Sequence, residues 1–138
     1  MLYLKEKAPS GYLFPALNCA NILDEVLVMG YPPIPCTADA YLLSQKGEIN
    51  SIVEDYVNRV ENLIISSTTR PGNSGGPVIS RSGYLVGMVT QYTAQKMSTD
   101  GKEEGLQIPY YMAIEGKTLY KCIKEIDQQV NVNFEDYQ

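Results

Sequence analysis

Hydrophobic residues along this chain gather in short runs bounded by proline, glycine and polar residues, a pattern typical of strands joined by turns. The run at 25–31 stops at Pro-Pro-Ile-Pro, because a proline has no amide proton to donate to a sheet. The short link at 81–83 ends in glycine and predicts a hairpin. Further strand-like runs occupy 2–5, 76–80, 83–92 and 105–114. The pattern therefore predicts a mainly β fold.

The segments between these runs are predicted to be turns and loops. Prolines, a glycine and asparagines across 8–24 indicate a surface connection, and Lys46-Gly47 indicates a turn. The polar, glycine-bounded stretch 97–105 is typical of a mobile loop. The tail at 131–138 is expected to fray.

The stretch 49–65 supports two interpretations. Its apolar residues recur at i, i+3, i+4 and i+7, which favours an amphipathic helix. Yet isoleucine, valine and tyrosine dominate it, and these residues favour strands. The spacing alone leaves helix and strand equally open. The residues concerned are Ile49, Ile52, Val53, Tyr56, Val60, Leu63 and Ile64.

The stretch 115–127 is predicted to be an amphipathic helix that closes the domain. Its apolar residues fall on one helical face and its lysines fall elsewhere, which is the pattern of a helix packed on a core. The apolar set is Leu119, Cys122, Ile123 and Ile126, and the lysines are Lys117, Lys121 and Lys124.

Composition narrows the class of protein. The chain has 138 residues, enough for one domain over 1–138 with a core, and 44% of them are hydrophobic. Its net charge of -5 argues against a nucleic-acid binder, which normally presents a basic face. No apolar run approaches the roughly 20 residues that span a bilayer, and the N-terminal stretch is too short for a signal peptide. We therefore expect no nucleic acid and no membrane among its partners, and a cytoplasmic location.

The three cysteines, Cys19, Cys36 and Cys122, are widely spaced and odd in number. A metal site usually needs paired short spacings and often histidine, and the chain has no histidine. We expect buried thiols in a reducing compartment, with one Cys19–Cys36 disulfide as the alternative. No metal and no cofactor is expected.

The stretch Arg-Pro-Gly-Asn-Ser-Gly-Gly-Pro-Val at 70–78 has the composition of a loop that presents a serine nucleophile. Such a serine must be exposed at a tight turn, beside backbone N–H groups that stabilise an oxyanion. Gly72, Gly75 and Gly76 around Ser74 allow that backbone shape. A serine also needs a base, and the absence of histidine leaves this one without its usual partner.

The loop and its flanks resemble the trypsin-like (chymotrypsin-fold) serine peptidases, most closely their bacterial HtrA-like branch. Six consecutive loop residues agree, and the hairpin and the Leu-Val-Gly-Met-Val-Thr stretch that follow have the matching spacing. Runs at 25–33, 61–69 and 108–126 also match in order, so the resemblance covers nearly the whole chain. It implies an all-β fold: an antiparallel six-stranded Greek-key β-barrel, the second half of a double barrel, with a C-terminal α-helix. It also favours strands over a helix at 49–65.

The resemblance offers an explanation for the missing histidine. In this family the catalytic His and Asp lie in and around the first barrel, and the stretch 1–5 resembles the end of the strand that follows the Asp. We therefore expect this chain to be the C-terminal half of a longer peptidase, with the N-terminal barrel of the same protein as its partner. The chain alone is predicted to be inactive and to self-associate, for example as a homodimer.

Carried over residue by residue, the resemblance makes Ser74 the nucleophile and the N–H groups of Gly72 and Ser74 the oxyanion hole. Thr68 matches the floor of the primary specificity pocket. A peptide or protein is the expected substrate, and the strand that pairs with its backbone corresponds to Thr90, Gln91 and Tyr92.

Two positions depart from the family pattern. Asn73 stands where many secreted members have an Asp that pairs with a freshly cut N-terminus, which places activation by such a cleavage in doubt; the HtrA-like branch shares this Asn. Tyr92 stands where many members have Gly, which would narrow the pocket entrance. Because Thr68 and Thr90 bring no carboxylate, we expect a small or medium uncharged residue before the cut bond.

Two alternatives stand beside an endopeptidase. The first is a catalytically inactive protease-fold module used for protein binding or scaffolding, and the sequence encoded upstream would distinguish it by lacking the His and Asp. The second is a Ser–Lys dyad with Lys96 or Lys102. It is disfavoured because both lysines lie in a polar stretch, where such side chains are normally solvated.

Overall fold

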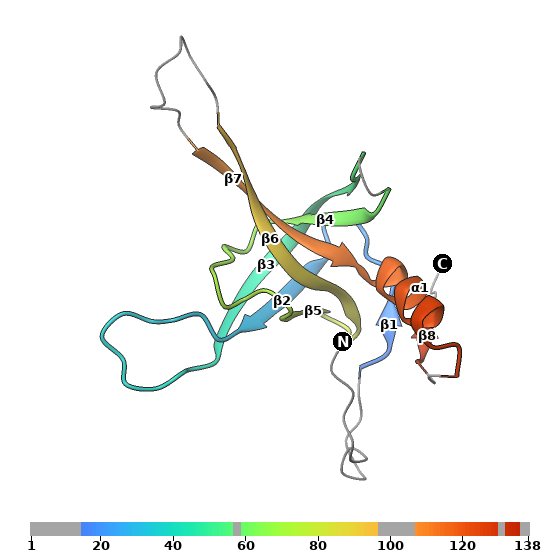
Figure 1. Ribbon diagram of the computed structural model, residues 1–138, viewed down its shortest axis with the longest axis horizontal. Helices are drawn as coiled ribbons and strands as arrows, with labels where there is room; N and C mark the ends of the chain where they lie inside the picture. The colour runs from blue at the N-terminus through green and yellow to red at the C-terminus, as the bar shows by residue number, and fades with distance from the viewer. Residues whose placement is uncertain (1–14, 57–58, 97–106, 130–131, 136–138) are drawn as a thin grey trace.

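The computed structural model describes residues 15–56, 59–96, 107–129 and 132–135. These residues form eight strands and one helix, which Figure 1 shows. The elements are β1 (Leu17–Asn18), β2 (Glu25–Gly30), β3 (Leu43–Glu54), β4 (Glu61–Ile65), β5 (Pro77–Ser80), β6 (Leu85–Lys96), β7 (Gln107–Glu115), α1 (Gly116–Ile126) and β8 (Phe134–Glu135).

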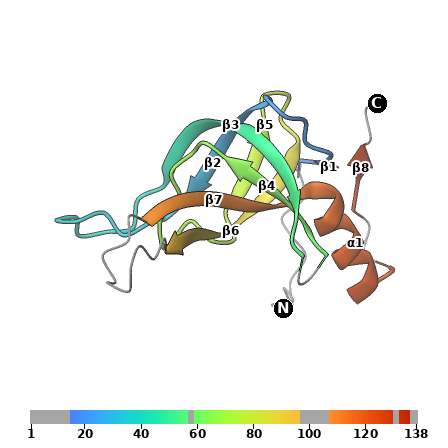
Figure 2. The same cartoon turned by 90° about the horizontal axis from the view of Figure 1, so that it is seen from above.

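Six of the strands form a closed antiparallel barrel. Hydrogen-bonded neighbours follow the order β5-β2-β3-β4-β7-β6, and β5 also pairs with β6, which closes the ring. Outside the ring, β1 pairs in parallel with β6, and β8 pairs in parallel with β1. Figure 2 shows α1 and β8 together beside one end of the barrel. The predicted fold class, a six-stranded antiparallel barrel with a C-terminal helix, is confirmed.

The stretch 49–65 forms strands β3 and β4, so the helical interpretation of its spacing is wrong. The two strands pair antiparallel, with Ile52 opposite Leu63 and a β-bulge between Ile49 and Ser51. A bulge adds one residue to a strand and shifts the alternation of its side chains. As a result Ile49 and Ile52, three residues apart, both contact the core. The bulge therefore produces a helix-like spacing inside a strand.

The core consists of inward-facing side chains from the barrel strands. In β2, for example, Val26 and Val28 are buried, whereas Leu27 between them is exposed. Most core residues are β-branched or small, which suits the pleated inner surface of a sheet. The buried cluster contains Ala20, Val26, Val28, Ile49, Leu63, Ile65, Val78, Val86, Val89 and Ala113.

The turn expected at Lys46-Gly47 is wrong, because both residues lie inside β3. Lys46 is opposite Leu27 and Gly47 is opposite Val26 on β2. The glycine serves close packing rather than chain reversal: a Cβ at Gly47 would collide with the hydroxyl of Ser67. Sequence pattern alone does not distinguish these two uses of glycine.

Two further segments are more ordered than expected. The connection before Glu25 contains β1, whose two residues, Leu17 and Asn18, are buried. The C-terminal tail contributes β8, where the ring of Phe134 lies 5.0 Å from that of Tyr120 on α1, measured between centroids. An aromatic contact of this kind holds a tail that would otherwise fray. The loop expected at 97–105 and the strand expected at 2–5 lie outside the described residues.

Helix α1 is one residue shorter at each end than the expected range 115–127. Glu115 caps it: the carboxylate accepts hydrogen bonds from the amides of Lys117 (2.7 Å) and Thr118 (3.1 Å). Leu119 and Ile123 are half-buried, but Cys122 is exposed, so the packed face is narrower than expected. Within the described ranges, no helix has the length and apolar character needed to cross a membrane.

The three cysteines form no disulfide, so the Cys19–Cys36 alternative is wrong. The expectation of buried thiols is also wrong for two of them. Cys36 is exposed because it lies in the β2–β3 connection outside the barrel, and Cys122 is exposed on α1. Cys19 is half-buried.

Candidate active site

Ser74 lies in a loop built from two consecutive β-turns. In the first turn, the Asn73 amide donates to the Arg70 carbonyl oxygen at 2.9 Å. In the second, the Gly76 amide donates to the Asn73 carbonyl oxygen at 2.8 Å. Each is an i to i+3 bond, and together they fix the path of the chain on both sides of Ser74.

Glycines occupy the third position of both turns. Gly72 has a φ of 98° and Gly75 a φ of 81°, in the region that favours glycine. A positive φ at this position defines a type II turn, in which the second residue keeps an ordinary φ. In the second turn that residue is Ser74, whose side chain is exposed. The sequence thus folds locally so that the serine projects from the corner of a tight turn.

The loop is in close contact with the end of β2. A Cβ at Gly30 would lie 2.9 Å from the Cα of Asn73, and a Cβ at Gly76 would collide with the Met29 carbonyl oxygen. Two backbones meet here because neither glycine carries a side chain. Gly30 was not among the expected site residues; its position at the end of a strand, before Tyr-Pro-Pro, was the available signal.

Asn73 holds the loop from inside. Its side chain is 0% exposed, and its Oδ1 accepts a hydrogen bond from the Arg70 amide at 3.1 Å. This bond spans the first turn beside the backbone bond, so the side chain reinforces the same bend. A neutral amide can do this without a counter-charge, whereas a buried aspartate would need one.

The Ser74 hydroxyl donates a hydrogen bond to the Thr90 carbonyl oxygen at 2.5 Å. Backbone bonds tie the same loop to β6: the Gly75 amide donates to the Val89 carbonyl oxygen (2.8 Å), and the Val89 amide donates to the Gly76 carbonyl oxygen (2.9 Å). Ser74 is therefore held beside β6, the strand that the sequence resemblance led us to expect as the substrate-binding one. Because the chain has no histidine, a histidine base for Ser74 would have to come from another polypeptide segment.

The amides of Gly72 and Ser74 differ from the others in the loop. Those of Asn73, Gly75 and Gly76 donate within the barrel domain, whereas these two donate to no atom of the described residues. Two uncommitted N–H groups beside an exposed hydroxyl are what an oxyanion hole requires.

The remaining expected site residues lie on two segments. Thr68 is exposed, between Ser67 and Thr69, which are 3% and 6% exposed. Thr90 is half-buried, and its hydroxyl donates to the Met112 carbonyl oxygen at 3.4 Å. Ser74 and Thr90 are thus brought into direct contact, whereas Thr68 lies on the segment before the loop.

The backbone of Gln91 and Tyr92 belongs to β6, where the pairing with β7 shifts register between Val89 and Tyr92. Such a bulge re-aims the strand next to Ser74. The side chains of Gln91, Tyr92 and Lys96 lie outside the described part of the structure, as does Lys102, so the Ser–Lys alternative stays untested.

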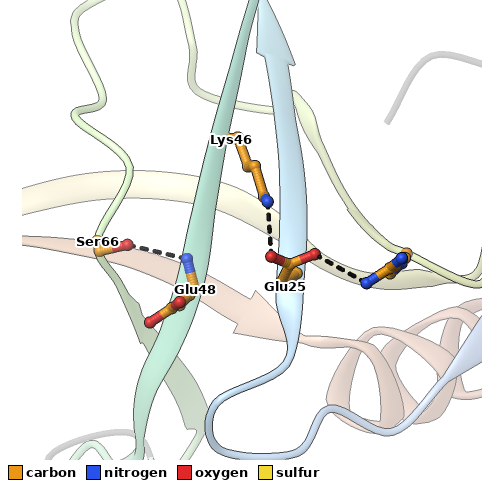
Figure 3. Close-up of polar contacts among 5 residues, drawn as sticks. Glu25, Lys46, Glu48 and Ser66 are labelled. Atoms are coloured by element: carbon orange, nitrogen blue, oxygen red, sulfur yellow. Dashed lines mark hydrogen bonds and ion pairs between the residues drawn. The ribbon is translucent and has the colours of Figure 1, made fainter.

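Charged groups with perturbed pKa values lie away from Ser74. Lys46 lowers the pKa of Glu25 through a hydrogen-bonded ion pair of 2.6 Å on the outer face of the barrel (Figure 3). Arg81 lies 3.5 Å from the other oxygen of the same carboxylate. Burial raises the pKa of Glu115, and hydrogen bonds from backbone amides offset only part of this effect. Among the described residues, no three His, Cys, Asp or Glu side chains are grouped to hold a metal.

A cavity of about 480 Å3 lies between the segment at 18–25 and the β5–β6 hairpin. Its lining includes Asn18, Asp24, Arg81 and Tyr84 but no residue of the Ser74 loop. Because β5 runs away from the loop, this cavity is at the opposite end of that strand and is not part of the candidate site.

Comparison with known proteins points in the same direction as the loop geometry. The family model of the trypsin-like peptidase domain matches residues 4–88. This span contains β2 to β5 and the whole Ser74 loop. A search of curated proteins finds no match.

Solved structures of the HtrA-type protease AlgW share the fold. A serine-to-alanine variant with a tripeptide superposes with a TM-score of 0.60 at 18% identity, over 90% of this chain and 39% of that chain. The same type of variant with a decapeptide gives 0.57 at 19% identity, over 86% and 34%. AlgW with a decapeptide gives 0.56 at 20% identity, over 83% and 33%. The present chain thus spans about a third of the length of these chains.

Proposed function

The chain belongs to the trypsin-like peptidase domain family, and from this we propose that it is the C-terminal half of a serine endopeptidase whose nucleophile is Ser74. The observation that carries the proposal is the double-turn loop, which exposes the Ser74 hydroxyl beside two uncommitted amides. A serine peptidase needs this combination of hydroxyl and N–H donors at one place.

In the proposed reaction, the Ser74 hydroxyl attacks the carbonyl carbon of a peptide bond. A histidine supplied by the N-terminal barrel takes the hydroxyl proton and passes it to the leaving amine. Before it attacks, the hydroxyl must break the hydrogen bond that it donates to the Thr90 carbonyl oxygen. Water then hydrolyses the acyl-enzyme on Ser74, with the same histidine acting as base.

The N–H groups of Gly72 and Ser74 are proposed to hold the oxyanion that forms in each step. Removal of one such donor typically costs about 10²–10³-fold in rate. The type II turn at Gly72 and the buried Asn73 side chain would keep these donors in place before substrate arrives. Preorganisation of this kind is the main source of their effect.

Substrate is proposed to pair with the β6 segment Thr90–Gln91–Tyr92. The side chain of the substrate residue that precedes the cut bond would then lie against Thr68. Beyond Met88, the described pairings of β6 join it to β7 alone, so its other edge can receive an extended peptide. The AlgW structures that share this fold are complexes with short peptides.

The missing partner is proposed to be a first barrel of the same polypeptide. This chain spans only about a third of the length of the AlgW chains, so their remaining length is enough to include such a domain. The partly covered apolar face of α1 also supports it, since Ile126 is 58% exposed. Helices with one apolar face normally bury it against another element.

The test is to express the chain together with its natural upstream sequence and to measure hydrolysis of a peptide ester and of casein. Ser74→Ala should lower turnover at least about 10³-fold. Ser82→Ala is the matched control, because Ser82 is an exposed turn serine in the β5–β6 hairpin. Equal turnover in the Ser74→Ala variant and the parent would overturn the proposal.

A binding or scaffolding module is the second candidate, and the absence of histidine from the chain favours it. The upstream sequence separates the two. A histidine and an aspartate at the family positions support the peptidase. If either is missing and the joined protein still binds peptides without cleaving them, the module is the better description.

A further inference from the structure

Three polar side-chain atoms lie buried in the barrel with no hydrogen-bond partner among the described residues: Gln45 Nε2, Ser67 Oγ and Asn73 Nδ2. Ser67 is 3% exposed and Asn73 is 0% exposed. Polar groups in such positions normally bond to the protein or to an internal water molecule, because leaving them unpaired is costly. The placement of the three atoms suggests a common partner.

Two of these atoms, on Gln45 and Ser67, lie along the inner face of β3. Leu43, Gln45, Gly47 and Ile49 share this face, since the residues between them are exposed. The Ser67 hydroxyl takes the place that a side chain on Gly47 would fill. Gln45 is the next inward residue along the strand, two positions or roughly 7 Å away.

The third atom reaches the same face from the loop. Gly30 is opposite Leu43 in the β2–β3 register, and a Cβ on Gly30 would lie 2.7 Å from Asn73 Nδ2. Asn73 therefore fills the space beside Leu43, two positions from Gln45 on the other side. Gln45 thus lies between Asn73 and Ser67 on an otherwise apolar inner surface.

We propose that a chain of internal water molecules occupies the inner face of β3 and joins Asn73 to Ser67 through Gln45. Water matches the chemistry of the three groups. The two amide nitrogens only donate and so need an acceptor, whereas the hydroxyl can donate or accept. An anion fits less well, because two neutral amides supply no positive charge to balance it.

The water chain gives Gln45 a role that the sequence motif does not suggest. It connects the residue before Ser74 with the residue before Thr68, so it would hold the loop and the expected pocket floor in one arrangement. The hydration site does not depend on the proposed function and stands whether or not Ser74 is a nucleophile.

Oxygen-17 magnetic relaxation dispersion counts internal waters with long residence times and tests the proposal on this chain directly. In Gln45→Leu, the leucine removes the central donor and fills its space, so at least one such water should be lost. Ser44→Ala is the matched control, because Ser44 is the adjacent exposed residue of β3, and its count should equal that of the parent. Equal counts in the parent and in Gln45→Leu would overturn the proposal.

A second measurement needs no variant and decides the matter if Gln45→Leu fails to fold. In the parent chain, the side-chain amide protons of Asn73 should show a nuclear Overhauser effect to a long-lived water. The Gln45 side-chain amide protons should show one as well. A high-resolution crystal structure in which both amides donate directly to protein carbonyl oxygens would rule the water chain out.

Discussion

At the scale of single residues, Gly30 and Gly76 determine where the Ser74 loop can lie, because any side chain at either position would collide with the neighbouring backbone. The motif at 70–78 identified the residues that present the hydroxyl, because turn chemistry is local and visible in sequence. The contact between Gly30 and Asn73 joins positions 43 residues apart, so no local pattern could predict it. Only the folded structure, in which the end of β2 lies against the loop, reveals this contact.

The contact at Gly30 can be tested by adding a single methyl group. Gly30→Ala would place a Cβ within 3 Å of the Asn73 backbone, so the loop must shift. We expect a loss of about 1–3 kcal/mol in the free energy of unfolding, measured by urea denaturation. Ser44→Ala on the neighbouring strand should change it by less than about 0.5 kcal/mol. A Gly30→Ala variant as stable as the parent would show that the loop is not held against β2.

At the scale of elements, the helix and the barrel strands differ in how well sequence predicted them. The apolar face of α1 was recognisable because it follows one period from Leu119 to Ile126. The β3–β4 hairpin was not, because the bulge after Ile49 interrupts the period of two on which strand prediction relies. Resemblance to a family corrected this error where periodicity could not.

The cap of α1 makes a pH-dependent contribution to stability. Burial raises the pKa of Glu115 above 4.5, so the folded state binds its proton more tightly than the unfolded state does. The resulting stabilisation is complete below about pH 4.5 and is lost as the pH rises through the folded-state pKa. Glu115→Gln keeps an acceptor for the Lys117 and Thr118 amides but cannot titrate.

Thermal unfolding of the parent and of Glu115→Gln at several pH values between 4.5 and 7 checks this expectation. The parent should lose stability relative to the variant as the pH rises. Taking the difference between the two proteins removes the opposite contribution of Glu25, whose lowered pKa favours folding above its ordinary value of 4.5. A constant difference across the range would mean that Glu115 titrates normally.

At the scale of the whole molecule, the proposed peptidase should not prefer basic residues. Thr68 is the expected floor of the specificity pocket and Thr90 is an expected substrate-binding residue on β6. Neither supplies the carboxylate that an Arg or Lys side chain needs. Cleavage profiling of the protein joined to its upstream sequence should return mostly small or medium uncharged residues before the cut bond. A profile dominated by Arg and Lys would contradict this assignment of the pocket.

The chain studied alone is also predicted to self-associate. Large apolar side chains are exposed at several places in the described residues, and apolar surface that stays uncovered favours association. Sedimentation at moderate concentration should therefore show dimers or larger species, and a clean monomer at high concentration would refute the prediction. The exposed side chains include Ile22, Leu23, Tyr31, Leu42, Tyr56 and Ile126.

The closure of the barrel by β5 has a consequence for the order of folding. This four-residue strand begins directly after the Ser74 loop and pairs with β2, some fifty residues earlier, as well as with β6. Contacts between such distant segments form late, because they require a large loop to close first. The Ser74 loop receives its supports from β2 and β6, so it can take its shape only when the ring closes. The newly made chain would therefore present no organised hydroxyl until the rest of the barrel had formed.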